Sequence, residues 1–187
     1  MTERFQSVLE QADDRIVAGR AMDGDVAAFA VLVRRYTPMM RAYTRRMLNA
    51  TSDVDDIVQE AFITAWQRFS ELDDPSKVKS WLMRIVSRKA VDRIRALRPV
   101  LDIDDMERPA PLNTSPAQVV EARAGVAALG AALQELPNAQ RECWVLREMG
   151  GYSYDEIADE LGISASTARG LLARARKYMI VRMEEWR

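Results

Sequence analysis

The sequence contains no histidine and a single cysteine, Cys143. Without histidine, the chain lacks the side chain that most often transfers protons near neutral pH and that most often binds zinc. The apolar neighbours of Cys143 favour a buried, unreactive thiol over a redox sensor. No run approaches the roughly 18 apolar residues of a membrane-spanning helix, and the charged first residues do not resemble a secretion signal. We therefore expect a cytoplasmic protein with no metal, no cofactor and no membrane insertion of its own.

Glycine is also scarce, with 8 residues among 187, and no segment alternates apolar and polar residues as a half-buried strand does. Apolar residues recur instead at intervals of three and four, which predicts an all-α protein. Pro38 is expected to kink or break one such helix near Thr37, because proline lacks the amide hydrogen and its ring crowds the preceding turn. The apolar stripe of this helix, which begins near Asp25, is Val26, Phe29, Val33, Tyr36, Met40, Tyr43 and Met47.

Four prolines and several acids between residues 99 and 116 predict an extended, flexible acidic linker. The linker separates two small helical bundles, which we place at residues 23–98 and 117–187. Residues 1–22 are predicted to form an amphipathic helical extension, which could pack on either bundle. Its apolar residues are Phe5, Val8, Leu9 and Ile16.

The formal net charge of −1 hides two basic segments. Residues 84–98 hold six basic side chains against the single acid Asp92, and residues 165–187 hold six against two acids. Two separated basic segments indicate two contacts with nucleic acid. Residues 53–60 are acidic and contain no base, so this part is expected to face something other than DNA.

The second bundle carries the pattern of a helix-turn-helix. Ser153 and Glu156 form a capping box that opens a short helix ending at Leu161. Gly162 allows a tight turn, and Ser164 caps a second helix running to about Met183. This second helix is expected to enter the major groove by its N-terminal turn. An ordinary helical hairpin with a solvated basic face is the alternative.

The first bundle contains a mixed acidic and apolar face. Asp56, Gln59, Glu60 and Ile63 fall at i, i+3, i+4 and i+7 of a helix predicted to be capped by Ser52 and to end near Phe69. This combination indicates a protein-docking face. A merely solvated face stays open as an alternative, and so does a pair of catalytic or metal-binding carboxylates, although no further ligands accompany them.

The next predicted helix, beginning at Ser76 or Lys77, carries a basic stripe. Trp81 lies beside lysines near its start, where it could stack on unpaired bases or belong to the core. The stripe consists of Arg84, Arg88, Asp92 and Arg95, at i, i+4, i+8 and i+11, and is suited to phosphate contacts.

Taken in order, these pieces resemble the extracytoplasmic-function sigma factors of the sigma-70 family, from about Asp25 to Met179. In the first half, the motifs that carry the resemblance are residues 55–62 followed by Ala65-Trp66, residues 80–85 and residues 92–95. In the second half they are Leu136-Pro137, residues 140–142, residues 152–158 and residues 161–164.

The resemblance implies a factor that binds bacterial core RNA polymerase, recognises promoter DNA and is held inactive by an anti-sigma factor. Residues implied to bind the polymerase are Asp55, Asp56, Gln59, Glu60 and Ile63. Residues implied to recognise and melt the −10 element are Lys77, Lys79, Trp81, Arg84, Arg88, Asp92 and Arg95. Residues implied to bind the −35 element are Ser164, Ser166, Thr167, Arg169, Arg174, Arg176 and Lys177.

The chain departs from the family pattern at Val78, at Arg88 and over residues 168–171, so the sequences of the two promoter elements do not follow from the resemblance. A helix-turn-helix regulator that acts without polymerase is the alternative function. That alternative leaves the acidic helix and the Trp81 segment unused. An enzyme would need a nucleophile or metal constellation, and the sequence suggests neither.

Overall fold

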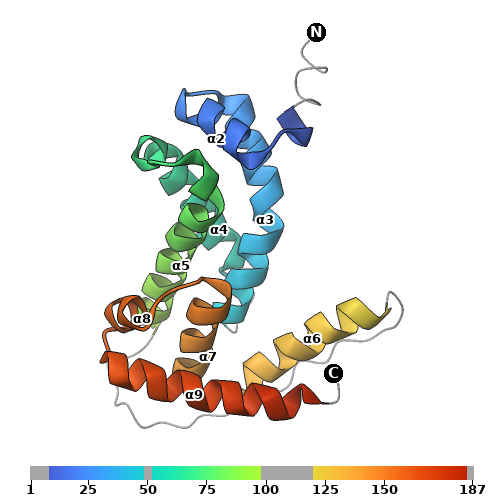
Figure 1. Ribbon diagram of the computed structural model, residues 1–187, viewed down its shortest axis with the longest axis vertical. Helices are drawn as coiled ribbons and strands as arrows, with labels where there is room; N and C mark the ends of the chain where they lie inside the picture. The colour runs from blue at the N-terminus through green and yellow to red at the C-terminus, as the bar shows by residue number, and fades with distance from the viewer. Residues whose placement is uncertain (1–8, 49–51, 98–119, 185–187) are drawn as a thin grey trace. The chain divides into compact units, whose positions relative to one another are not determined.

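The chain is all-α in the part that the structure describes, as the sequence predicts. The computed structural model describes residues 9–48, 52–97 and 120–184, and these ranges contain helices and turns without a strand. Two compact units, Met1–Arg95 and Ala96–Arg187, make up the chain (Figure 1). The predicted linker at residues 99–116 lies outside the described residues, as do Phe5 and Val8.

Over its described residues, the first unit contains a helical stretch at residues 9–11, four further α-helices and two short 3-10 helices. The α-helices are α2 (Asp14–Met22), α3 (Val26–Leu48), α4 (Val54–Gln67) and α5 (Val78–Leu97). The 3-10 helices η1 (Phe69–Glu71) and η2 (Pro75–Lys77) connect α4 to α5. Inside the unit, the hydroxyls of Tyr43 on α3 and Ser87 on α5 share a buried hydrogen bond of 2.6 Å.

Helix α3 continues through Pro38, so of the kink or break expected near Thr37 the break does not occur. The Thr37 hydroxyl donates a hydrogen bond of 2.6 Å to the carbonyl of Val33 just before the proline. Buried side chains lie on both sides of Pro38, and their packing outweighs the local cost of about 3 kcal/mol for a proline inside a helix. These buried side chains are Val31, Leu32, Tyr36, Met40, Tyr43 and Met47.

Two details of the helix starts differ from the sequence prediction. Asp53, rather than Ser52, stands at the N-cap of α4. Its carboxylate forms no cap hydrogen bond and is instead held at 2.7 Å by Arg93 of α5. Val26, predicted to lie in the apolar core stripe, is 67% exposed because it occupies the first turn of α3, beyond the core that covers the rest of the helix.

Arg35 of α3 holds the N-terminal segment in place. Its guanidinium donates hydrogen bonds to the carbonyls of Leu9, Glu10 and Ala12 at 3.2, 2.8 and 2.7 Å. It also pairs with the carboxylate of Asp14. Burial and a hydrogen bond to the same carboxylate raise the pKa of Tyr36.

The predicted single helix over residues 1–22 is interrupted at residues 12–13 within its described part. Asp13 there is the N-cap of α2 and accepts a hydrogen bond of 2.8 Å from Arg15 N, so a new helix starts at this point. Helix α2 then packs on α3, η1 and η2. Ile16, predicted to be on the apolar face, is 58% exposed. The sequence left the packing partner of this segment open, and the structure assigns it to the first unit.

The first described helices that lie wholly in the second unit are α6 (Val120–Glu135) and α7 (Asn138–Trp144), which Pro137 separates. A π-helical turn, η3 (Val145–Met149), continues α7. Gly151 then adopts a left-handed conformation with φ of 73°, whereas Gly150 does not. Cys143 is fully buried, and this burial raises the pKa of its thiol to about 11.

Helices α8 (Tyr154–Leu161) and α9 (Ala165–Arg182) complete the unit and form the predicted helix-turn-helix. The capping box is present: Glu156 N donates to Ser153 Oγ at 3.1 Å, and Ser153 N donates to Glu156 Oε2 at 2.8 Å. Gly162 ends α8 with φ of 66°, a conformation that favours glycine. Ser164 then caps α9 by accepting a hydrogen bond of 3.1 Å from Thr167 N.

We expect Arg35→Ala to lower the free energy of unfolding by about 2 kcal/mol, because a hydrogen bond from a charged group contributes roughly 1.5–3 kcal/mol. Amide exchange in α2 should accelerate more than exchange in α4. Arg34→Ala is the matched control, since Arg34 forms only an exposed ion pair with Glu10. Such a pair contributes about 1 kcal/mol or less. Equal losses in both variants would contradict the anchoring role of Arg35.

Replacing two glycines of the second unit by alanine should change the stability of the protein in opposite directions. At Gly170 in α9, the nearest atom to an added Cβ lies 3.7 Å away, so Gly170→Ala should raise stability by about 1 kcal/mol through helix propensity. At Gly150, the Cβ would lie 2.7 Å from the carbonyl oxygen of Leu146, so Gly150→Ala should destabilise by about 1–3 kcal/mol. Urea unfolding of both variants measures the difference, and a shared sign would refute the steric argument.

Candidate protein-docking and nucleic-acid interfaces

The predicted docking face on α4 is exposed to solvent. Asp55 at one end pairs with Arg41 of α3 at 2.6 Å, and Glu60 approaches Lys89 of α5 at 3.7 Å. Both ion pairs link α4 to its neighbours while leaving the carboxylates more than half exposed. All five residues predicted to form the face are exposed: Asp55, Asp56, Gln59, Glu60 and Ile63.

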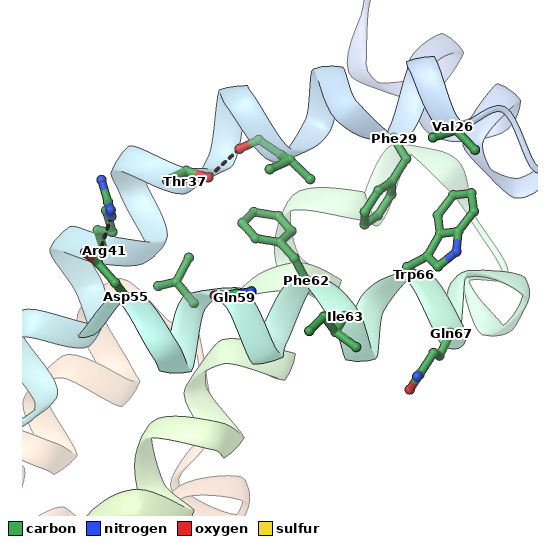
Figure 2. A pocket seen from close by; sticks show the side chains of 12 residues that line it. Val26, Phe29, Thr37, Arg41, Asp55, Gln59, Phe62, Ile63, Trp66 and Gln67 are labelled. Carbon is green, nitrogen blue, oxygen red and sulfur yellow. Dashed lines mark hydrogen bonds and ion pairs between the residues drawn. The ribbon is translucent and has the colours of Figure 1, made fainter. Parts of the chain in front are cut away.

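An apolar groove of about 590 Å³ lies between α3 and α4, directly beside this face (Figure 2). Asp55, Gln59 and Ile63 belong to both the face and the groove lining. Figure 2 shows Phe62 and Trp66 pointing from α4 toward α3. The face therefore presents carboxylates next to a hydrophobic channel.

The groove exposes apolar side chains to an unusual degree. Ile63 is 50% exposed, Trp66 is 39% exposed, and Val26 on the opposite wall is 67% exposed. Clustered exposed apolar residues with a polar rim are typical of a protein-interaction site. The sequence prediction missed Val26, Phe29 and Val33 as groove residues, because their three-and-four spacing is equally consistent with a core.

An aromatic cluster forms the floor of the groove and reaches α5. The Phe29 ring lies 4.9 Å from the Trp66 ring and 5.5 Å from the Phe69 ring. Phe69 in turn meets the Trp81 ring edge-on at 5.3 Å. Trp81 is half-buried, so part of its ring belongs to the core and part remains accessible. Both of the roles predicted for Trp81 are compatible with this position.

The basic stripe of α5 lies on the side that faces solvent. Its members, Arg84, Arg88, Asp92 and Arg95, are all exposed. Arg95 and Asp92 form an ion pair of 3.7 Å, so the acid can orient the neighbouring guanidinium. Two further basic residues, Lys89 and Arg93, pair with acids of α4 and do not belong to the stripe.

The segment that precedes Trp81 is ordered by its own side chains. Asp74 accepts hydrogen bonds from the Ser76 amide at 2.9 Å and from the Ser76 hydroxyl at 2.7 Å. The Ser76 hydrogen bonds, with a smaller contribution from Lys77, lower the pKa of Asp74. Lys77 and Lys79 are exposed on this segment. Because α2 packs on η2, the segment has a fixed support on one side.

The first turn of α9 exposes the hydroxyls predicted to meet DNA. Ser164 Oγ lies 2.8 Å from both Ser166 Oγ and Thr167 Oγ1, so the three hydroxyls form a connected group. The basic side chains lie farther along the same helix. All seven predicted residues are exposed: Ser164, Ser166, Thr167, Arg169, Arg174, Arg176 and Lys177.

Arg176 differs from its neighbours, because two of its nitrogens donate to the Glu148 carboxylate at 2.9 and 2.6 Å. The Glu148 carboxylate raises the pKa of the guanidinium. A contact between Arg176 and a phosphate therefore competes with an existing ion pair. In the same region, the guanidinium groups of Arg147 and Arg169 both lie over the Tyr154 ring. Arg147 and Tyr154 were not among the residues predicted to bind DNA.

Within residues 9–48, 52–97 and 120–184, no group of three or more His, Cys, Asp or Glu side chains is arranged to hold a metal ion. Among the helices described, none combines the length and the apolar character required to span a bilayer.

Family models match both halves of the chain. The model of sigma-70 region 2 matches residues 32–99, and a model of sigma-70 region 4 matches residues 127–179. The first range contains α4, α5 and most of α3, and the second contains the helix-turn-helix.

Curated relatives match over almost the full length. The chain is 37% identical over 169 residues to the RNA polymerase sigma factor NccH of Alcaligenes xylosoxydans xylosoxydans, covering 87% of this chain and 90% of NccH. It is 32% identical over 169 residues to the ECF RNA polymerase sigma factor SigM of Mycobacterium tuberculosis, covering 89% and 82%.

Solved structures show the same fold. CnrH, a sigma factor of Cupriavidus metallidurans, was solved in complex with the cytosolic domain of CnrY. It matches with a TM-score of 0.55 and 29% identity over 92% of this chain and 97% of CnrH. RpoE of Bartonella quintana, solved with the anti-sigma factor NepR, shares the fold with a TM-score of 0.57 at 22% identity, over 87% of this chain and 100% of RpoE. The chain therefore belongs to the extracytoplasmic-function (ECF) group of RNA polymerase sigma factors in the sigma-70 family.

Proposed function

We propose that this chain binds bacterial core RNA polymerase and directs it to promoters that carry paired −35 and −10 elements. The observation that carries the proposal is the order of the two family matches, region 2 over residues 32–99 and region 4 over residues 127–179. An exposed docking face and two exposed basic faces lie within those same ranges. On this proposal the protein acts in the cytoplasm as an initiation factor and has no catalytic activity of its own.

We propose that consecutive segments of the chain have different functions. Residues 23–98 serve as sigma domain 2, which binds the polymerase and the −10 element, and residues 117–187 serve as sigma domain 4, which binds the −35 element. The acidic linker at residues 99–116 threads toward the polymerase active centre and mimics nucleic acid in a basic channel. Residues 1–22 precede sigma domain 2 as an N-terminal extension.

Docking on the polymerase rests on the α4 face, which we propose binds the coiled coil of the largest subunit. The Asp56 and Glu60 carboxylates supply charge complementarity to a basic partner, which favours fast association and correct orientation. Ile63 supplies the apolar contact at the edge of the groove, where both Ile63 and the partner's side chain lose water on binding. Asp55 and Gln59 complete the polar rim.

Opening of the −10 element rests on α5 and the segment before it. The stripe from Arg84 to Arg95 binds backbone phosphates, while Trp81 with Lys77 and Lys79 lies beside the unpaired strand. A flipped base is captured at residues 74–80, which the sequence suggested as a loop and which form η2 and the first turn of α5. Stacking and phosphate contacts stabilise single-stranded DNA without chemistry on the base.

Recognition of the −35 element rests on α9. Its N-terminal turn enters the major groove, where Ser164, Ser166, Thr167 and Arg169 meet base edges and phosphates. Arg174, Arg176 and Lys177 bind the phosphate backbone farther along, which adds affinity without sequence discrimination.

An anti-sigma factor is proposed to hold the protein inactive by covering the α4 face. The groove supports this, because exposed Ile63 and Trp66 offer apolar area that a partner can bury. Binding there would exclude the polymerase, because both partners would use the same residues.

Run-off transcription from fragmented bacterial genomic DNA tests the proposed function. Purified core polymerase is assayed with and without the full chain. We expect new, discrete start sites that share two upstream motifs, because a sigma factor confers promoter specificity on the core enzyme. If no new starts arise and the protein alone protects duplex DNA from cleavage, the protein is instead a helix-turn-helix regulator that acts without polymerase.

Ile63→Glu should weaken binding to core polymerase by at least tenfold. Burial of one large aliphatic side chain contributes about 1.5–3 kcal/mol, and each 1.4 kcal/mol is about a factor of ten. Ile16→Glu is the matched control, since Ile16 is similarly exposed on α2 of the same unit. Titration of labelled protein with core polymerase measures both affinities. An unchanged affinity for Ile63→Glu, or an equal loss for both variants, would contradict the docking assignment.

A further inference from the structure

The Tyr154 ring, at the start of α8, lies beneath two guanidinium groups. The Cζ atom of Arg147 is 5.1 Å from the ring centroid, and that of Arg169 is 5.3 Å away. The three side chains come from η3, α8 and α9. Both distances are within the range of an attractive cation–π interaction. The ring therefore joins the recognition helix to the elements that precede it.

Two neighbouring interactions keep this ring in place. Tyr154 directly follows Ser153, whose capping box with Glu156 sets the first turn of α8. Arg147 donates a hydrogen bond of 2.6 Å from Nη1 to the carbonyl of Tyr152, so its guanidinium is held on the protein side. Tyr154 is only half-buried, whereas Arg169 is exposed. The stack thus runs from a fixed arginine through the ring to a side chain at the surface.

We propose that Tyr154 is a positioning residue that holds the Arg169 guanidinium in its DNA-binding conformation before DNA arrives. An exposed arginine loses considerable side-chain freedom when it is ordered on a ligand, and an arrangement that exists beforehand reduces that loss. Arg169 lies in the second turn of α9, next to the three connected hydroxyls of Ser164, Ser166 and Thr167. This inference rests on the proposed function, because it assigns Arg169 to the −35 contact.

A double-mutant cycle on the full chain in holoenzyme tests the proposal. The variants are Tyr154→Leu, Arg169→Ala and their combination, assayed for binding to a promoter fragment mapped by run-off transcription. Tyr154→Leu should weaken binding about two- to fivefold, the range expected from one exposed cation–π contact. The same change should lose most of its effect in the Arg169→Ala background, because the guanidinium that stacks on the ring has then been removed.

Tyr154→Phe is the control that separates the ring from the hydroxyl. The Glu148 carboxylate raises the pKa of Arg176 most, and the Tyr154 hydroxyl adds to this effect. Phenylalanine keeps the ring and should retain wild-type binding within about twofold. If Tyr154→Phe binds as weakly as Tyr154→Leu, the hydroxyl rather than the stack is responsible and the proposal is wrong.

NMR of the free chain gives a readout that does not depend on DNA. The Arg169 side-chain protons should show ring-current shifts in the wild type and in Tyr154→Phe, and lose them in Tyr154→Leu. Absence of these shifts in the wild type overturns the proposal even where Tyr154→Leu fails to fold. An equal effect of Tyr154→Leu in both backgrounds of the cycle also overturns it, because Tyr154 then acts independently of Arg169.

Failure of the proposed function is distinguishable from failure of this inference. A wild-type chain that initiates at no promoter contradicts the proposed function. The cycle is then carried out with the free chain on the duplex DNA that it protects, and the same coupling between Tyr154 and Arg169 decides the inference.

Discussion

Contacts among five aromatic rings organise the first unit, including the docking face and the −10 face that we propose for it. Phe29 of α3 touches Phe62, Trp66 and Phe69, and Phe69 touches Trp81 of α5. The cluster connects three helices and the 3-10 turn between two of them. Aromatic pairs at these separations add stability beyond the area that they bury. Phe29, Phe62 and Trp66 of this cluster also line the apolar groove, and Trp81 lies at the start of the basic helix, so the docking and −10 faces share one support.

The second unit depends on local backbone chemistry to a greater degree. The capping box at Ser153, the left-handed Gly162 and the cap at Ser164 set the ends of α8 and α9 within a few residues of one another. Ala158 of α8 and Ala168 and Leu172 of α9 are buried, and small side chains allow two packed helices to approach closely. A recognition helix with a fixed N-terminal end presents its first turn in one orientation. Sequence-specific contact with the major groove of DNA requires this.

Much of this arrangement could be predicted from the sequence. The all-α class, the capping box, the glycine turn and the exposure of the docking and basic residues follow from short-range patterns, because each depends on neighbours within about one helical turn. The errors have long-range causes. Pro38 stays inside a helix because distant side chains bury both flanks, and Asp53 replaces Ser52 at the cap position while its carboxylate turns to Arg93, 40 residues away.

The sequence by itself determined where α8 begins and ends and where α9 begins, which residues carry charge on which face, and the resemblance that identified the family. The tertiary structure alone decided that α3 and α4 enclose an apolar groove, that Arg35 binds the N-terminal segment to the first unit, and that Tyr154 contacts two arginines from different elements. The physical reason is that periodicity reports only that a side chain faces away from water. Which other side chain it then meets depends on how helices pack, and packing joins residues that are far apart in the chain.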